Sequence, residues 1–408
     1  MMKKKYKVRK REGCRICSGD CKLIHKIENA PFTDEFLTNG LDAFTYDIDI
    51  YSCNDCGTIQ TLHDVNVISY YDDYQYTVGN STTAQKFMNE ISRRIKLEYF
   101  ETSNNPKVLE IGSGDGEQLK FFKDNGFSVY GIEPSKPLCQ ISKSKGIDCC
   151  HSFFDKDSSN RAIDYLGNPD LIFMSYTFDH IPDPVPTLNL SRDLLRKNGL
   201  LVFEVHNIRD ILIRGEYCLL EHEHSIYLDE YYAAKLLESC GFKIINLDIV
   251  PHHIRRANSL IVVATLAENS NYQEISSHEL NSISLDYRND LGMKINQTID
   301  NLDKYVFSHF HDGKRIIAYG AGGRGVMTLA AMKSAVCFKA IYDMSPKSIG
   351  TFVPKTNIPL LDASMISQKD ADLVIVFSFG YIDEISAYLL EKGFSDNQIV
   401  NLLELLET

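Results

Sequence analysis

Short apolar runs alternate with amphipathic stretches through the middle of the chain. Apolar residues recur at helical spacing from Thr82 to about Glu101, and this pattern ends before Pro106. The runs that follow are rich in β-branched and other apolar residues, as strands buried on both faces are. These runs are Val108–Ile111, Val129–Ile132, Leu171–Met174, Leu200–Val205, Ile244–Leu247 and Ser259–Thr265. The pattern predicts an α/β domain built on a doubly wound sheet.

The alternation of predicted strands and helices begins again in the last third of the chain. A polar stretch from Glu268 to about Ser282 indicates a linker, and an amphipathic helix that ends near Phe307 follows it. Strands are then predicted at Arg315–Tyr319, Phe338–Tyr342 and Asp372–Phe377. We therefore expect three domains: an N-terminal module at residues 1–80, the main α/β domain at 81–267, and a smaller Rossmann-like domain at 268–408.

Composition and charge narrow the function classes. The 408 residues are 44% hydrophobic and 24% charged, which is typical of a globular protein with two or three domains. The net charge of −12 argues against a protein that binds the phosphates of nucleic acid. The sequence shows neither an apolar run long enough to span a membrane nor a signal-peptide pattern, so we expect a cytoplasmic protein without a membrane partner. It is compatible with a monomer.

Four of the eleven cysteines form two closely spaced pairs. Two residues separate Cys14 from Cys17 and Cys53 from Cys56, and 35 residues lie between the pairs. Four thiolates in this arrangement suit a tetrahedral structural zinc ion, around which a small module can fold. Cys21 is a substitute ligand in this interpretation. The alternative is reduced free thiols, because a chain without export signals is not expected to build a disulfide framework.

A glycine-rich turn follows the first strand of the main domain. Its candidate cofactor-binding residues are Glu110, Gly112, Ser113, Gly114 and Gly116, and Glu133 and Pro134 end the next strand. Glycine lets the backbone pass close to a ligand, and a carboxylate at the second strand end can accept hydrogen bonds from ribose hydroxyls. A nicotinamide dinucleotide and S-adenosylmethionine (SAM) both fit these features. An acid before GxGxG resembles motif I of class I SAM-dependent methyltransferases, which favours SAM.

A second glycine loop lies in the C-terminal part of the chain. Residues 320–325 satisfy the GxGxxG pattern, and Asp343 follows eighteen residues after this loop. Such a pattern alone has a high false-positive rate, and Arg324 inside the loop could grip a substrate phosphate instead. Three interpretations therefore stay open: a redox dinucleotide site, a contact with the nucleotide of a substrate, and a structural turn.

Ionisable side chains gather after two strands of the main domain. Glu221, His222, Glu223 and His224 are consecutive beyond the fourth strand, and His180 follows the third. Parallel α/β sheets place their sites at this edge, and a His/Glu pair suits proton abstraction. A metal site is less favoured, because in a strand these glutamates and histidines would alternate and the helical HExxH spacing is missing. Surface residues without a chemical role are the third interpretation, and for His180 a loop or helix-capping role is the alternative.

Taken together, the motifs resemble those of the sugar C-methyltransferases of deoxysugar biosynthesis. The similarity covers nearly the whole chain. Its motifs are the two cysteine pairs, Tyr74-x-Tyr76, Glu223-His224, Tyr319-Gly320-Ala321 and residues 354–359, Pro-Lys-Thr-Asn-Ile-Pro. The resemblance implies a zinc-binding N-terminal domain, a class I methyltransferase domain and a Rossmann-like C-terminal domain. It also implies that the substrate is a nucleotide-linked keto sugar, methylated next to its ketone.

The resemblance further implies roles for individual residues. His224 is similar to the active-site base of that family, Glu223 to its supporting carboxylate, and His180 and Tyr76 to further active-site groups. Where the family usually has tyrosine, this chain has Glu221, so we expect the substrate to offer a hydrogen-bond donor there. Methyl transfer to oxygen or nitrogen of a nucleotide sugar, an NAD-dependent sugar oxidoreductase and a non-catalytic zinc protein are the competing hypotheses.

Overall fold

The computed structural model describes residues 6–65, 71, 81–255, 258–283, 290–344 and 348–406. The chain forms two compact units, each assembled from three segments. Unit 1 comprises Met1–Cys21, Cys53–Ile208 and Ser225–Ile283, and unit 2 comprises Lys22–Ser52, Arg209–His224 and Ser284–Thr408. The expected division at residues 1–80, 81–267 and 268–408 stays a prediction.

Unit 1 is built on a seven-stranded sheet with the order β12-β13-β10-β9-β6-β7-β8. Its strands are β6 (Lys107–Ile111), β7 (Ser128–Glu133), β8 (Cys149–His151), β9 (Leu171–Ser175), β10 (Leu200–His206), β12 (Phe242–Leu247) and β13 (Ser259–Leu266). The pairs from β8 to β10 are parallel, whereas β13 runs antiparallel to both β10 and β12. The predicted α/β sheet is confirmed, and its short edge strand β8 was not predicted.

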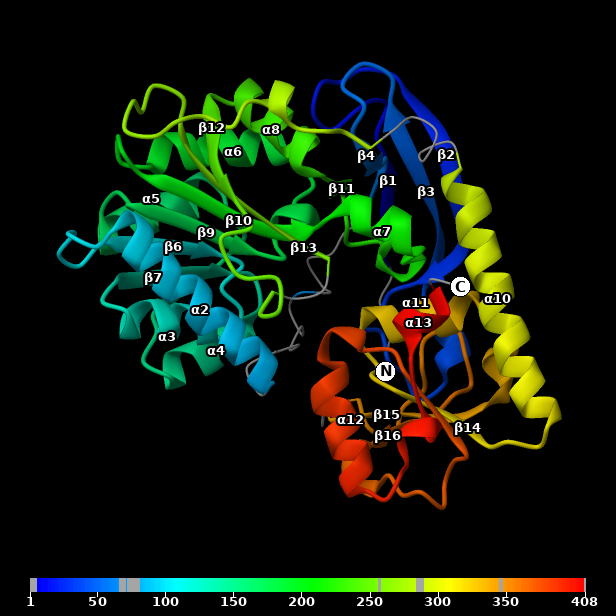
Figure 1. Ribbon diagram of the computed structural model, residues 1–408. Helices are drawn as coiled ribbons and strands as arrows, with labels where there is room; N and C mark the ends of the chain where they lie inside the picture. The colour runs from blue at the N-terminus through cyan, green and yellow to red at the C-terminus, as the bar shows by residue number, and fades with distance from the viewer. Residues whose placement is uncertain are drawn as a thin grey trace. The chain divides into compact units, whose positions relative to one another are not determined.

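Helices cover both faces of this sheet, with α2 and α3 on one face and α6 and α8 on the other (Figure 1). The helices are α2 (Thr82–Tyr99), α3 (Glu117–Asp124), α4 (Lys136–Ser144), α5 (Lys156–Leu166), α6 (Pro184–Leu194), α7 (Ile208–Arg214) and α8 (Glu230–Ser239). Ser81 caps α2 by accepting the Ala84 N–H, and fully buried rings such as Phe173 and Phe203 fill the core. Both faces of the strands are buried, which explains their continuous apolar runs.

Short strands surround the cysteine pairs in unit 1. β1 (Val8–Lys10) pairs antiparallel with β5 (His63–Val65), and β4 (Ile59–Thr61) pairs antiparallel with β11 (Ile226–Tyr227). The sequence pattern did not predict these strands. The cysteines therefore lie beside a small β-structure joined to the main domain of unit 1.

Unit 2 contains a five-stranded parallel sheet with the order β16-β15-β14-β17-β18. Its strands are β14 (Ile316–Tyr319), β15 (Phe338–Asp343), β16 (Leu360–Asp362), β17 (Leu373–Val376) and β18 (Ile399–Asn401). Its helices are α10 (Leu291–His311), α11 (Gly323–Ala331), α12 (Ile382–Glu391) and α13 (Leu402–Leu406). The predicted Rossmann-like sheet and the helix before it are confirmed.

Two longer strands and several single turns complete the described chain. β2 (Cys21–Pro31) and β3 (Thr45–Cys53) are hydrogen-bonded neighbours that lie almost entirely in unit 2. The 3-10 turns are η1 (Gly40–Asp42), η2 (Phe178–His180), η3 (Tyr217–Leu219), η4 (Ser277–Glu279), η5 (Lys333–Cys337), η6 (Ala363–Met365), η7 (Phe379–Tyr381) and η8 (Asp396–Gln398). Within the described ranges, every helix is too short or too polar to cross a membrane.

Candidate active site

The glycine turn after β6 is shaped by its backbone conformation. Gly112, Gly114 and Gly116 all have positive φ angles, of 71°, 54° and 77°, which glycine adopts without strain. A Cβ atom at Gly112 would collide with the side chain of Thr177, whereas a Cβ at Gly114 would meet no atom within 4 Å. Gly114 therefore borders open space, as expected where a ligand passes close to the backbone.

Glu133, at the end of β7, is hydrogen-bonded to this turn. Its Oε2 atom accepts the Gly114 N–H at 2.8 Å and its Oε1 atom accepts the Ser135 N–H at 2.7 Å. Burial raises the pKa of Glu133 to about 7, despite these hydrogen bonds. Each carboxylate oxygen has a second lone pair, so the chemistry of the group also suits ribose hydroxyls.

The other predicted cofactor residues lie around the same turn. Glu110 is buried in β6, and Ser113 is buried with its side chain against the backbone of Gly131. The Pro134 carbonyl is hydrogen-bonded to Nε2 of His151 at 2.9 Å. An open glycine turn with a buried acid before it and a second acid behind it fits the nucleoside and the amino-acid end of SAM.

His180 lies in η2, just beyond the carboxyl end of β9. Its Nδ1 atom is 3.4 Å from the hydroxyl of Tyr71. The loop is held by Ser225, whose N–H donates to the Asp179 carbonyl and whose hydroxyl donates to the Ile181 carbonyl. The predicted active-site residue Tyr76 lies outside the described residues.

The Glu221–His224 segment has a turn at His222 and Glu223 and is not a strand. His224 is buried, and its Nδ1 atom is 2.7 Å from the Leu219 carbonyl, to which only a protonated Nδ1 can donate. Its N–H also donates to the Glu221 carbonyl. In the neutral ring, Nε2 is then the nitrogen that can accept a proton. Glu223, the predicted supporting carboxylate, is buried in the same turn.

His222 has the surroundings of a structural histidine. Its Nε2 atom is 2.9 Å from the Ala30 carbonyl, and its ring lies 5.2 Å from the ring of Phe32. The ring also lies close to Phe44 and Tyr46. These contacts anchor the turn within unit 2.

Glu221 lies against the second glycine loop. A Cβ atom at Gly323, the first residue of α11, would be 2.4 Å from the Oε1 atom of Glu221. Burial raises the pKa of Glu221 well above its usual range, and the neighbouring charge of Glu223 raises it further. The carboxyl group therefore occupies the place where a Rossmann helix N-terminus receives an anion.

Sequence reasoning missed three polar residues at the carboxyl edge of the unit 1 sheet. Nδ1 of His206, at the end of β10, is 3.1 Å from Oδ2 of Asp179. The ring of Tyr176 packs 4.3 Å from the His206 ring. Their position after strand ends was the available signal, but no short motif connects them.

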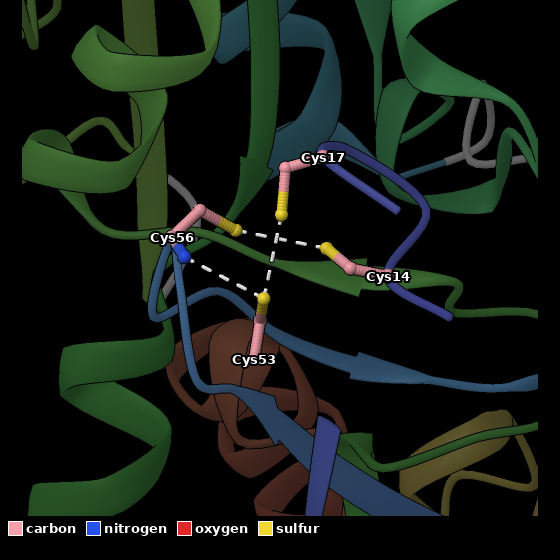
Figure 2. A group of neighbouring side chains, drawn as sticks. All are labelled: Cys14, Cys17, Cys53 and Cys56. Atoms are coloured by element: carbon pink, nitrogen blue, oxygen red, sulfur yellow. Dashed lines mark hydrogen bonds between the residues drawn. The ribbon is translucent and has the colours of Figure 1, made fainter. Parts of the chain in front are cut away.

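The four paired cysteines converge in unit 1 (Figure 2). Sγ of Cys14 is 3.6 Å from Sγ of Cys56, and Sγ of Cys17 is 3.5 Å from Sγ of Cys53. Ligands of a tetrahedral zinc at about 2.3 Å lie about 3.8 Å apart, so the spacing fits this ion. Cys21 is not part of the group, and its thiol donates to the Gly19 carbonyl.

Backbone and side-chain donors surround these sulfurs, as they do in metal-binding turns. The Cys14 sulfur accepts the Ile16 N–H and the Gln60 side-chain amide, and the Cys53 sulfur accepts the Cys56 N–H. A hydrogen bond from the Cys56 thiol lowers the pKa of Cys14 to about 4. The group therefore favours thiolate over thiol at Cys14.

Two family models match the chain in succession. A methyltransferase domain matches residues 84–273, and a C-methyltransferase C-terminal domain matches residues 263–400. The C-methyltransferase NovU of Streptomyces niveus is 23% identical over 405 residues, which cover 96% of this chain and 94% of NovU. Over nearly its whole length the chain is similar to a C-methyltransferase, and the two family models agree with this similarity. It is a SAM-dependent methyltransferase with the class I fold, as the sequence predicted.

Two further proteins match only part of this chain. An uncharacterized methyltransferase of Bacillus thuringiensis strain Al Hakam is 32% identical over 103 residues, which cover 24% of this chain and 45% of that protein. The solved structure of the CcbJ methyltransferase from Streptomyces caelestis covers 49% of this chain and 96% of its own, at 15% identity and a TM-score of 0.35. NovU can be compared with this chain over nearly the whole length of both proteins.

Proposed function

We propose that this enzyme methylates the carbon next to the ketone of a nucleotide-linked keto-deoxysugar. The observation that carries the proposal is the hydrogen bond between His224 Nδ1 and the Leu219 carbonyl, which makes Nε2 the basic nitrogen. A base of this kind is what carbon methylation needs, because the carbon is not nucleophilic until its proton is removed. The match to NovU over nearly the full length supports the same reaction class.

The glycine turn of unit 1 is the proposed SAM site. Bound SAM would supply an electrophilic methyl group. The proposed contacts are Glu110, Gly112, Ser113, Gly114, Gly116, Glu133 and Pro134. Glu133 would accept hydrogen bonds from the ribose hydroxyls while it keeps its bonds to the Gly114 and Ser135 amides.

The proposed chemistry starts with His224. Its Nε2 atom takes the proton from the carbon beside the ketone, and the electron pair of that C–H bond forms an enolate. Glu223 stabilises the positive charge of the protonated His224 ring, and His180 donates a hydrogen bond to the enolate oxygen. Tyr76 and Glu221 remain predicted substrate contacts.

The cysteine group is proposed to hold one structural zinc ion. The fit of the four sulfurs to a tetrahedral ion supports this role. Four protein thiolates would saturate the ion, so zinc would stabilise the module without acting on the substrate.

Methylation of oxygen or nitrogen is the competing proposal. It needs a base to deprotonate a hydroxyl or amine but no enolate, so His224 would serve there as well. The oxidoreductase hypothesis is less favoured, because the carboxyl group of Glu221 lies at the α11 N-terminus, where the phosphates of a dinucleotide would bind.

The test is a panel of nucleotide-linked keto sugars incubated with SAM and analysed by mass spectrometry, with the methylated atom assigned by NMR. We expect a gain of one methyl group on carbon. We also expect exchange of the α-proton with deuterated solvent when SAM is left out. A methyl group on oxygen or nitrogen without α-proton exchange would replace this proposal with its competitor.

A further inference from the structure

Three side chains that have no role in the proposed chemistry meet at the carboxyl ends of β9 and β10. They are Tyr176 and Asp179, which follow β9, and His206, which ends β10. These two strands are neighbours, and β9 also pairs with β6, which leads into the cofactor turn. The group therefore lies on the edge of the sheet where α/β enzymes place their substrates.

The contact between His206 and Asp179 is mostly shielded from water. Nδ1 of His206 lies 3.1 Å from Oδ2 of Asp179, and the side chains are 13% and 5% exposed. The Asp179 carbonyl accepts hydrogen bonds from both the N–H and the hydroxyl of Ser225, at 2.7 and 3.0 Å. The carboxylate is thus anchored through its own backbone, and it favours the protonated imidazole.

Tyr176 adds a strained backbone to this group. Its φ angle is +46°, a conformation that is rare for a residue with a bulky side chain. Its N–H donates to the Glu204 carbonyl, and its ring packs 4.3 Å from the His206 ring. Such strain persists where the surroundings impose it, and it concentrates at functional sites.

The group is connected to the cofactor turn through Thr177. The Thr177 side chain fills the space where Gly112 would carry a Cβ, within 2.4 Å of that position. Thr177 follows Tyr176 directly and lies two residues before Asp179. The loop whose residues Tyr176 and Asp179 contact His206 therefore also contacts the cofactor turn, through Thr177.

We propose that His206 is a further catalytic residue that donates a hydrogen bond from its Nε2–H to the oxyanion of the enolate. This inference rests on the proposed function. When the C–H bond breaks, its proton goes to the base and its electron pair moves toward the ketone oxygen. His206 keeps both of its protons, one toward Asp179 and one toward that oxygen. Asp179 is then a positioning residue that fixes the ring and its charge.

The contribution of such a hydrogen-bond donor to turnover can be measured. Removal of one preorganised donor from an oxyanion site typically costs about 10²–10³ in turnover. Replacement of His206 by Phe keeps a ring against Tyr176 and removes the donor. Replacement of Asp179 by Asn keeps the size of the side chain and removes the charge.

The experiment measures α-proton exchange without SAM, methyl transfer with SAM, and SAM affinity by calorimetry. We expect His206→Phe to lower both exchange and turnover by about 10²–10³, with SAM affinity within twofold of wild type. The matched control is His278→Phe, an exposed histidine in η4, which should keep wild-type values.

The Asp179→Asn variant tests whether Asp179 acts by positioning the His206 ring or by supporting the fold. It should lower turnover by itself but cause little further loss in the His206→Phe background, because its effect acts through that ring. Turnover of His206→Phe within threefold of wild type would overturn the inference while the proposed function stands. Absence of exchange and of methylation by the wild-type enzyme on every keto sugar would overturn both.

Discussion

The guanidinium of Arg15 donates a hydrogen bond of 2.9 Å to the carbonyl of Pro182, two residues after His180. Arg15 belongs to the first cysteine pair, and its guanidinium also bonds to Asp64 and to the Thr61 and His63 carbonyls. One buried side chain thus joins the cysteine module to the loop that carries a proposed active-site residue. The module is therefore hydrogen-bonded to the part of unit 1 that carries the proposed active-site residue His180.

Substitution of Arg15 by Lys should lower turnover more than it lowers SAM affinity. Lysine keeps the charge but loses the planar guanidinium, whose Nη1 donates to Asp64 and Pro182 while its Nε and Nη2 donate to other carbonyls of the module. We expect about a tenfold loss in kcat and no more than a twofold change in SAM affinity by calorimetry. Arg93→Lys, on the exposed surface of α2, is the control. Equal effects of the two substitutions would contradict the proposed connection.

The cysteine group should contain about one zinc ion per chain. Elemental analysis of the purified protein checks this stoichiometry. Cys53→Ser should remove the metal and destabilise the module, whereas Cys21→Ser should leave the metal content unchanged, because Cys21 is outside the group. Metal-free wild-type protein with four freely reactive thiols would argue for the free-thiol alternative.

Glu133 should make SAM binding dependent on pH. With a pKa of about 7 in the folded protein, this carboxyl favours the protonated form, so its contribution to folding stability is full below about pH 4.5 and is lost as the pH rises through 7. SAM needs the ionised acceptor, so its affinity should rise up to about pH 7 and then level off. Binding at pH 6.5 should release a proton, which calorimetry in buffers of different ionisation enthalpy detects.

The matched variants are Glu133→Ala and Glu98→Gln, the latter in α2 away from the turn. Loss of the Glu133 hydrogen bonds, worth about 1.5–3 kcal/mol, should weaken SAM binding by about ten- to a hundredfold and abolish proton release. Unchanged SAM affinity in Glu133→Ala would remove this residue from the proposed site.

His224→Ala should lose about 10²–10⁴ in turnover, the usual contribution of a general base, while SAM binding stays intact. His222→Ala should instead lower thermal stability, because the Ala30 carbonyl loses its partner. Turnover, SAM affinity and Tm of both variants provide the comparison. Near-normal turnover of His224→Ala would contradict the role of this residue as the base.

Glu221→Gln should stabilise the protein at alkaline pH. The pKa of this buried carboxyl is raised, so its stabilising contribution is present below about pH 4.5 and is lost as the pH rises toward the folded-state pKa. We expect the Tm of the variant to exceed that of wild type by a few degrees at pH 8, and the difference to vanish near pH 4.5. Scanning calorimetry across this range is the measurement.

The turnover of two variants, Glu221→Gln and Glu221→Leu, tests whether Glu221 also contacts the substrate. Gln retains a hydrogen-bond acceptor and Leu does not, so Gln should keep more turnover. Equal turnover of the Gln and Leu variants on one sugar would contradict a substrate contact there.

The sequence predicted those features that depend on local pattern. The longer strands of both sheets appear in the sequence as apolar runs, and the three glycines of the turn after β6 have positive φ angles. The three-residue strands β8, β16 and β18 were not predicted. By contrast, β1 and β5 are only three residues each and exist through long-range pairing, which no local pattern records. His206 and Asp179 are 27 residues apart, and only the order of the strands brings them together.

The position of Glu221 against Gly323 gives the glycine pattern of the second loop a structural reason that involves no ligand. The carboxyl group of Glu221 lies at the N-terminus of α11, where a Rossmann helix can receive an anion. Any side chain at position 323 would collide with this carboxyl group, so a substitution of Gly323 should displace the turn that carries His222 and His224.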